Sequence, residues 1–332
     1  MPPPRLIVIE GLPGTGKSTV AQRIAIDGAR LGLAAQWYYE EQRGHPLHGY
    51  FDPATDGTPD RFMDAAVARW RSFARDAGPG MQVVESHLMQ GPIGTLLLHG
   101  VDPETIPPFV ERLMRAADPL HPRLVFLRDA DPDSALRRIT TFRWGTVEDS
   151  PYVRRCDASP FAMARGIRGM SGLITFQRAW SLLADACLAR CGWPVLTVTG
   201  DLGDAAAHAD RYRTICEFLG LGPLPPAAAC DSRPYAGIYV PGTGAPAGNA
   251  ATAGARFTIA GDGDGLLVRG CPRLWRSGNR LLPRSLDRFH VVSWPLEAVF
   301  AMGPDGRAAT MRLVSPDGME PDLISTRIAD GG

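Results

Sequence analysis

The chain has 332 residues, a formal net charge of zero at pH 7 and 21% charged side chains. This balance excludes a broad basic surface for nucleic acid and a long acidic tail. The sequence contains no run of about 18 apolar residues, and the N-terminal apolar run ends at Glu10 without a cleavage-site pattern, so we predict no membrane span and no signal peptide. The six cysteines form no C-x-x-C pair, which favours a reduced, cytoplasmic protein.

From residue 5 to about residue 220, apolar runs of strand length alternate with longer segments of helical period. This alternation predicts a mostly parallel sheet with helices on both faces. The predicted strands are Arg5–Glu10, Leu33–Tyr39, Gln82–Ser86, Arg123–Arg128 and Val195–Thr199. The predicted helices are Lys17–Leu31, Asp60–Asp76, Glu104–Ala117, Asp131–Thr141, Gly172–Arg190 and Asp204–Leu219.

The composition changes after Leu221. Residues 222–234, GPLPPAAACDSRP, are rich in proline and small residues, which is typical of a linker. Short alternating strands follow, and Asp305–Gly306 lies between two apolar runs, which predicts a β-hairpin. We therefore predict an α/β domain over residues 1–222, a linker over 223–233, and a small all-β sandwich or barrel over 234–332.

Residues 6–19, LIVIEGLPGTGKST, match the pattern G-x-x-x-x-G-K-[ST] between a buried-type strand and a helix. Backbone N–H groups in such a loop point inward and meet the positive end of the helix, which makes an anion site. We expect Lys17 to reach the β- and γ-phosphates of ATP and the Ser18 hydroxyl to ligate Mg²⁺. The predicted ATP-binding residues of the loop are Gly11, Gly14, Thr15, Gly16, Lys17, Ser18 and Thr19.

Lys17 is the only lysine in the chain, and the other 34 basic residues are arginines. A phosphate loop needs a compact point charge on a thin stem, which the wide guanidinium of arginine does not provide. Without a second lysine the chain has no N-K-x-D guanine-reading motif, and it also has no LSGGQ-like segment. These observations exclude GTPases and transporter ATPases, and the full G-K-[ST] ending disfavours a sulfotransferase.

Three segments carry a resemblance to a known group. Residues 6–19 resemble the first strand and loop of thymidylate-kinase-like and deoxynucleoside-kinase-like proteins. VVESH (83–87) resembles the acidic segment that ends the third strand of deoxynucleoside kinases, and residues 124–143 are similar to the strand, acidic turn and Arg-bearing helix before their lid. The resemblance covers about residues 5–220 and implies a P-loop NTPase-type sheet and Mg²⁺- and ATP-dependent phosphoryl transfer to a hydroxyl or phosphate of a small molecule.

In the resembled families a carboxylate at the end of the second strand faces the acceptor. The matching stretch is WYYEEQRGHP, which contains Glu40 and Glu41. Strand alternation lets only one of them point into the cleft, and we favour Glu40 as the general base. Glu85 ends a strand where α/β sheets place ligands, so we expect it at Mg²⁺ or at the acceptor. Glu10 is expected to brace the loop or hold a metal-bound water, which leaves three acidic candidates for two roles.

Three arginines, Arg137, Arg138 and Arg143, lie in or just after the helix that precedes the lid. At least one of them is expected at the phosphates, with Arg137 on ATP and Arg138 and Arg143 in catalysis. Residues 146–169 lack clear periodicity and are interpreted as a lid or acceptor-binding loop. Its candidate readers of an anionic acceptor are Arg154, Arg155, Arg165 and Arg168.

Several features keep more than one interpretation. His45 and His48 fit a substrate-binding or exposed loop better than a metal pair. Five aromatic side chains can stack on a planar acceptor or pack in the core: Trp37, Tyr38, Tyr39, Tyr50 and Phe51. For the all-β module, covering the acceptor site, homodimer formation and binding of a second ligand all stay open. The alternative overall function is a regulatory ATPase or nucleotide switch with this module as its output.

Overall fold

The computed structural model describes residues 4–42, 44–48, 51–52, 56–147, 150–200, 205–224, 230–242, 256–275, 277–315 and 322–328. The chain divides into two compact units, Met1–Leu224 and Pro225–Gly332. The linker predicted at residues 223–233 lies partly outside the described residues. In the described ranges, no helix combines the length and apolar character needed to cross a membrane.

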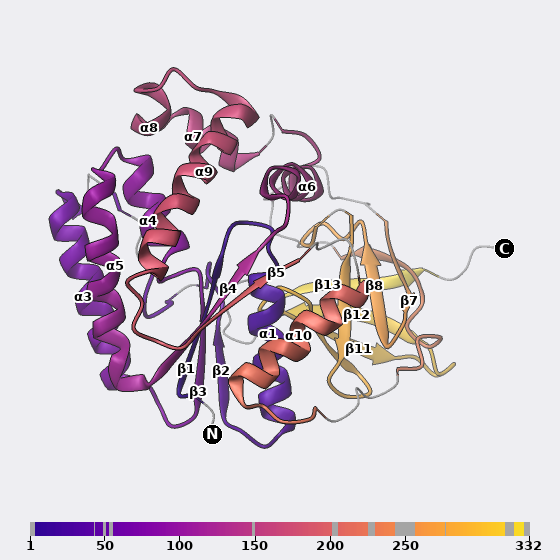
Figure 1. Cartoon of the computed structure of the whole chain (residues 1–332). Coiled ribbons are helices and arrows are strands. Elements are labelled where there is room, and N and C mark those ends of the chain that lie inside the picture. Colours follow the sequence, from indigo (N-terminus) through magenta and orange to yellow (C-terminus); the bar gives the residue numbers. More distant parts are fainter. Residues whose placement is uncertain are drawn as a thin grey trace. The chain divides into compact units, whose positions relative to one another are not determined.

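A five-stranded parallel sheet forms the centre of the first unit (Figure 1). Its order is β2-β3-β1-β4-β5, and every neighbouring pair is parallel. The strands are β1 (Leu6–Gly11), β2 (Ala35–Tyr38), β3 (Met81–Glu85), β4 (Pro122–Arg128) and β5 (Val195–Thr199). The predicted parallel sheet is therefore confirmed, with each strand within two residues of its expected bounds.

Helices link these strands. They are α1 (Lys17–Arg30), α3 (Pro59–Asp76), α4 (Gln90–Leu98), α5 (Ile106–Ala117), α6 (Pro132–Trp144), α9 (Gly169–Leu188) and α10 (Ala205–Leu219), with 3₁₀ turns at Pro103–Thr105 and Asp118–Leu120. Helix α4 was not predicted. Its sequence QGPIGTLLL contains two glycines and a proline, and most of the helix is buried, so it shows no amphipathic period.

The two faces of the sheet bury alternate residues of β1. Leu6 and Val8 pack in a cluster with side chains of α3, α4, α5 and α9, whereas Ile7 and Ile9 pack with α1 and α10. Figure 1 shows α3 and α5 on one side of the sheet and α1 and α10 on the other. Each fully buried side chain of this kind contributes about 1.5–3 kcal/mol. Burial on both faces explains why these strands are continuous apolar runs in the sequence.

Two short helices occupy the segment that we expected to be an irregular loop. They are α7 (Pro151–Asp157) and α8 (Pro160–Met163). Each begins with a serine at the N-cap followed by proline at the first helical position, and Ser159 Oγ accepts a hydrogen bond from the N–H of Ala162. This Ser-Pro signal is visible in the sequence and was missed because both helices are too short to show a period.

The second unit is a closed barrel of antiparallel strands in the order β10-β11-β12-β13-β6-β7-β8-β9. The strands are β6 (Gly237–Pro241), β7 (Phe257–Asp262), β8 (Gly265–Arg269), β9 (Asn279–Pro283), β10 (Arg288–Val291), β11 (Glu297–Met302), β12 (Ala308–Val314) and β13 (Leu323–Ile328). The predicted hairpin is confirmed, because β11 pairs with β12 and Gly306 in its turn has a φ of 74°. Strands β9 and β13 were not predicted.

Large side chains fill the barrel. Tyr239, Phe257 and Phe289 are buried. The ring of Phe300 lies 6.4 Å from that of Tyr239 and 5.4 Å from that of Phe289, and Phe257 stacks on Tyr239 at 5.6 Å. Of the two alternatives that the sequence left open, sandwich or barrel, the structure has the barrel. Its interior is a packed core of the size that side chains alone can fill.

Candidate functional site

The loop between β1 and α1 holds three glycines in conformations that other residues rarely adopt. The φ angles of Gly11, Gly14 and Gly16 are 146°, 86° and 85°. A Cβ at Gly11 would lie 2.3 Å from the carbonyl oxygen of Leu127 in β4, and one at Gly14 would lie 3.1 Å from the side chain of Ile139. Only glycine permits this close approach, so the loop packs tightly against the end of β4 and against α6.

Lys17 is buried at the centre of the loop. Its ammonium donates a hydrogen bond to the carbonyl oxygen of Leu12 at 2.9 Å, and the Thr15 hydroxyl donates to the same oxygen at 2.8 Å. Burial lowers the pKa of Lys17, and the nearby carboxylates of Glu40 and Glu85 oppose that shift. The single lysine is therefore buried, bonded to a backbone carbonyl of the loop, and influenced by the charges of nearby carboxylates.

Ser18 and Glu85 connect the start of α1 with the end of β3. Ser18 Oγ donates to Glu85 Oε2 at 2.7 Å, and the indole N–H of Trp37 donates to Glu85 Oε1 at 3.1 Å. Glu85 is completely buried, and this burial raises its pKa to about 8 although both hydrogen bonds lower it. A hydroxyl and a carboxylate oxygen this close form the kind of hard oxygen pair that Mg²⁺ accepts.

The Ser18–Glu85 pair fits the Mg²⁺ ion that the resemblance to P-loop kinases implies. Mg²⁺ is usually bound by one or two protein oxygens, with water and substrate phosphates completing the octahedron. In the described part of the chain, no group of three or more His, Cys, Asp or Glu side chains is arranged to hold a metal by itself. Ser18 and Glu85 would thus hold the ion together with phosphate oxygens, and it would supply neutralising charge there.

Glu10 is committed to the turn between β3 and α4. Its carboxylate is fully buried and accepts the backbone N–H groups of Leu88, Met89 and Gln90 at 2.8, 2.9 and 2.9 Å. Burial raises the pKa of Glu10 to about 7 against the effect of these three donors. Because the first N–H groups of a helix have no partner within it, Glu10 acts as a cap for α4. The carboxylate therefore braces the turn between β3 and α4, whereas we expected it to brace the phosphate loop or to hold a metal-bound water.

Glu40 and Glu41 take different environments. Glu40 is half-buried, its Oε1 accepts from Gln90 Nε2 at 3.0 Å, and its carbonyl oxygen lies 3.2 Å from His87 Nε2. Glu41 is exposed and accepts a hydrogen bond from the Tyr39 hydroxyl. The charge of Glu40 opposes the lowering of the Lys17 pKa, together with the charges of Glu85 and Glu10.

The three arginines of α6 point to different places. Arg143 is half-buried, donates to the Tyr152 hydroxyl at 3.0 Å, and its charge acts on Lys17 and Glu41. Arg138 is exposed and pairs with Asp129 at 3.2 Å, and Arg137 is exposed. The structure therefore brings Arg143 to the carboxylates near the loop, while Arg138 is held beside Asp129 after β4.

The arginines of residues 146–169 lie at the surface. Arg154, Arg155, Arg165 and Arg168 are all exposed. Arg165 lies 4.0 Å from the ring centroid of Phe161 and donates to the Phe161 carbonyl oxygen at 3.2 Å. Arg165 is thus engaged with α8.

Most of the candidate aromatics have structural contacts. Tyr38 donates to Gln82 Oε1 at 3.0 Å and packs edge-on against Phe73, and Phe51 is buried against Phe62. Trp37 binds Glu85 as described above and meets Tyr39 edge-on at 5.6 Å. Tyr50 lies outside the described residues.

The candidate histidines belong to a ring cluster. His45 is buried, its Nδ1 accepts from the N–H of Leu47 at 3.0 Å, and its ring lies 3.9 Å from that of His87. Burial lowers the pKa of His45 to about 2 and that of His87 to about 4, so both rings are neutral near pH 7. His48 is exposed and meets His87 edge-on at 6.3 Å.

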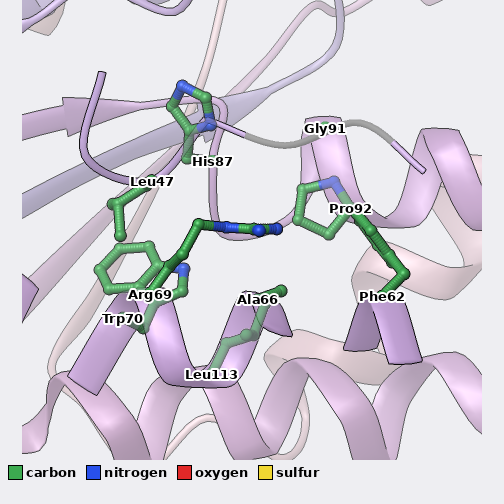
Figure 2. Close-up of a pocket in the computed structure, with 9 residues that line it drawn as sticks. All are labelled: Leu47, Phe62, Ala66, Arg69, Trp70, His87, Gly91, Pro92 and Leu113. Atoms are coloured by element: carbon green, nitrogen blue, oxygen red, sulfur yellow. The ribbon is translucent and has the colours of Figure 1, made fainter. Parts of the chain in front are cut away.

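A cavity adjoins this cluster between α3, α4 and α5 (Figure 2). The space between its lining residues is about 340 Å³ only when the adjoining open solvent is counted, so the enclosed part is small. The lining residues are Leu47, Phe62, Ala66, Arg69, Trp70, His87, Gly91, Pro92 and Leu113. Figure 2 shows the Arg69 guanidinium in the middle of the cavity with its tip toward Pro92. We name this cavity the Arg69 pocket.

Sheet topology explains why these groups meet. The carboxyl ends of parallel strands share one edge, so the residues after β1, β2, β3 and β4 converge there. Strand β1 is the middle strand, with β3 and β2 on one side of it and β4 and β5 on the other. Sequence reasoning missed His87, Gln90 and Arg69. The position of His87, two residues after Glu85 at the end of a predicted strand, could have indicated its place in the site. Gln90 and Arg69 lie in helices, and nothing in the neighbouring sequence marks them as site residues.

Comparisons with known proteins add little to this picture. No protein-family model matches the chain, and no curated protein matches it. Among solved structures, a thymidylate kinase from Candida albicans resembles it with a TM-score of 0.39 and 15% sequence identity, over 68% of this chain and 96% of that chain. A TM-score this low carries no information about activity, so we base the function on the site alone. The phosphate loop and the parallel sheet together give the first unit a P-loop kinase-like fold.

Proposed function

We propose that this protein is an ATP-dependent phosphotransferase that uses Mg²⁺ to move the γ-phosphoryl group of ATP to a hydroxyl or phosphate of a small molecule. The observation that carries the proposal is the grouping of Lys17, the Ser18–Glu85 pair and Glu40 at one edge of the sheet. Phosphoryl transfer requires a phosphate cradle, a metal position, a cation for developing charge and an acceptor for a proton, and each has a counterpart here.

The donor half is formed by the phosphate loop. Backbone N–H groups of Gly14, Thr15 and Gly16 bind the β-phosphate, and Lys17 exchanges its bond to the Leu12 carbonyl oxygen for the β- and γ-phosphates. Ser18 and Glu85 hold Mg²⁺. Because burial raises the pKa of Glu85, this carboxyl would have to be ionised to hold the ion near neutral pH.

The acceptor half is formed by Glu40 and Arg143. Glu40 takes the proton of the acceptor hydroxyl while the oxygen of that hydroxyl forms a bond to the γ-phosphorus of ATP. The bond between the γ-phosphorus and the oxygen that bridges it to the β-phosphate breaks, and ADP leaves. Arg143 stabilises the charge on the equatorial oxygens. The Gln90 amide holds Glu40 Oε1, which orients the carboxylate toward Lys17.

The proposal is tested with ATP labelled in the γ-phosphate, Mg²⁺, the full chain, and a panel of nucleosides, nucleotides and small hydroxylated metabolites. Label transfer to any acceptor supports it. If ATP is hydrolysed equally fast with and without every acceptor, the chain is a regulatory ATPase instead. Lys17→Arg keeps the charge but not the shape, and we expect ATP affinity to fall by about tenfold or more. Full activity of Lys17→Ala would contradict both functions.

A further inference from the structure

We propose that the Arg69 pocket binds a carboxylate of the acceptor molecule. This carboxylate would be at one end of the acceptor, and the group that receives the phosphoryl group would be at the other end. The identity of the ligand as the acceptor rests on the proposed function. The binding of a carboxylate by the pocket does not, because it follows from the residues that line it. The pocket would thus select acidic small molecules over neutral ones.

Arg69 is the reason for this inference. It is half-buried in α3, and among the described residues its Nε has no hydrogen-bond partner while being shielded from solvent. Arg112 of α5 shows the usual arrangement, because it pairs with Asp64 of the same helix α3 at 2.5 Å. A shielded guanidinium N–H without a partner is unfavourable in the free protein and is relieved by a ligand that accepts a hydrogen bond.

The lining of the pocket contains no acid to neutralise this charge. Its polar side chains, among the residues that the structure describes, are Arg69, Trp70 and His87, and none of them is an acid. The carboxylate that acts on the charge of Arg69 is Asp56, and Asp56 Oδ2 accepts the backbone N–H of Asp52 at 2.7 Å. The pocket therefore presents a net positive charge and has no carboxylate of its own.

The shape of the pocket distinguishes among anions. Its walls are apolar, with Leu47, Phe62, Ala66 and Leu113 around the guanidinium. The planar fork of arginine matches a planar carboxylate with two parallel hydrogen bonds, and one guanidinium balances one negative charge. A phosphate monoester is tetrahedral, carries close to two charges at pH 7 and loses more hydration, so this pocket suits it less.

The pocket is also connected to the proposed base. His87 lines it and places its Nε2 3.2 Å from the carbonyl oxygen of Glu40. Gly91 lines it as well and follows Gln90, whose side chain binds Glu40 Oε1. The pocket therefore adjoins the segment that holds Glu40, through His87 on one side and through Gly91 next to Gln90 on the other.

The test uses simple probes and needs no turnover. The full chain, labelled with ¹⁵N in arginine, is titrated with phenylacetate, phenylacetamide and phenyl phosphate while the Nε–H signals are followed by NMR. The variants are Arg69→Met, Arg69→Lys, and Arg71→Met as a control, because Arg71 is an exposed arginine of the same helix.

We expect phenylacetate to bind in the millimolar range and to shift one Nε–H signal, which is absent from Arg69→Met. Its affinity should fall by about tenfold in Arg69→Met, by less in Arg69→Lys, and stay within about twofold in Arg71→Met. The amide should bind about tenfold more weakly than the acid. Equal binding of acid and amide, tighter binding of the phosphate, absence of binding by the acid, or unchanged affinity in Arg69→Met would each overturn the proposal. Since no ATP is present, these outcomes are independent of the phosphoryl-transfer test.

Discussion

Gln90 Nε2 donates a hydrogen bond to Glu40 Oε1 at 3.0 Å, which ties the first residue of α4 to the segment after β2. The backbone N–H of the same Gln90 is held by the Glu10 carboxylate at 2.9 Å. A side chain at the end of β1 therefore fixes the helix start that in turn orients the proposed base. Such support is what keeps a catalytic group in its productive geometry.

Replacement of Gln90 by methionine should disturb the orientation of Glu40 without affecting the binding of ATP. Gln90→Met keeps the length of the side chain but removes the donor, so we expect kcat for ATP consumption to fall by about tenfold with an unchanged KM for ATP. Steady-state kinetics with water or an identified acceptor measure both constants. In the Glu40→Gln background the same change should have no further effect, and an equal loss in both backgrounds would show that Gln90 acts elsewhere. Gln36→Met, in an exposed position of β2, is the control.

The buried carboxyl of Glu85 should lower the free energy of unfolding at neutral and alkaline pH. Burial raises the pKa of Glu85 in the folded chain from 4.5 to about 8. Between these two pH values Glu85 is ionised in the unfolded chain but protonated in the folded chain. The free energy of unfolding therefore falls as the pH rises through this range. We expect Glu85→Gln to be more stable than the parent at pH 8 by about 1–2 kcal/mol, with a smaller difference at pH 5.

Thermal unfolding of Glu85→Gln at several pH values measures this difference. The variant should also lose Mg²⁺-dependent ATP consumption, because an amide is a poor ligand for the ion. Glu104→Gln, at an exposed glutamate, is the matched control for the change of charge. A stability difference that does not vary with pH would mean that Glu85 does not titrate in this range.

Arg143 should matter for the rate of transfer more than for ATP binding. Its charge acts on Lys17, and it donates a hydrogen bond to the Tyr152 hydroxyl of α7 at 3.0 Å. We expect Arg143→Met to lower kcat by about 10²- to 10³-fold with little change in KM for ATP. Arg115→Met, at an exposed arginine of α5, should leave both constants unchanged. A rise in KM alone would assign Arg143 to substrate binding.

Ser86 should be a strained position. Its φ is 65°, it is completely buried between Glu85 and His87, and its backbone is fixed by Ser86 N–H to the Ile9 carbonyl at 3.1 Å. A left-handed conformation costs a non-glycine residue about 1–2 kcal/mol, and more for a β-branched one. We expect Ser86→Gly to be as stable as the parent or about 0.5 kcal/mol more stable, and Ser86→Val to lose about 2 kcal/mol or more.

Chemical denaturation of both Ser86 variants tests this expectation. The control is Ser171→Gly on an exposed face of α9, where the same exchange in a helix should cost about 0.5–1 kcal/mol. If Ser86→Gly is destabilised as much as this control, the turn carries no strain.

Local patterns were sufficient for the phosphate loop and the framework of the fold. The glycine spacing, the single lysine and the buried strand before them specify the loop at Gly11–Ser18, because its geometry depends on neighbours within a few residues. The alternation of strand-length and helix-length segments specified the parallel sheet for a similar reason. The buried helix α4 and the Ser-Pro starts of α7 and α8 were missed, since neither produces a period.

The chain by itself determined that a phosphate loop with one lysine stands at the end of the first strand of a parallel sheet. Only the tertiary structure decided that the charges of Glu40 and Arg143 act on Lys17, that Arg138 pairs with Asp129, and that Arg69 lines a pocket beside His87. The physical reason is the strand order β2-β3-β1-β4-β5, which places residues from distant segments at one edge and leaves no trace of their contacts in the local sequence.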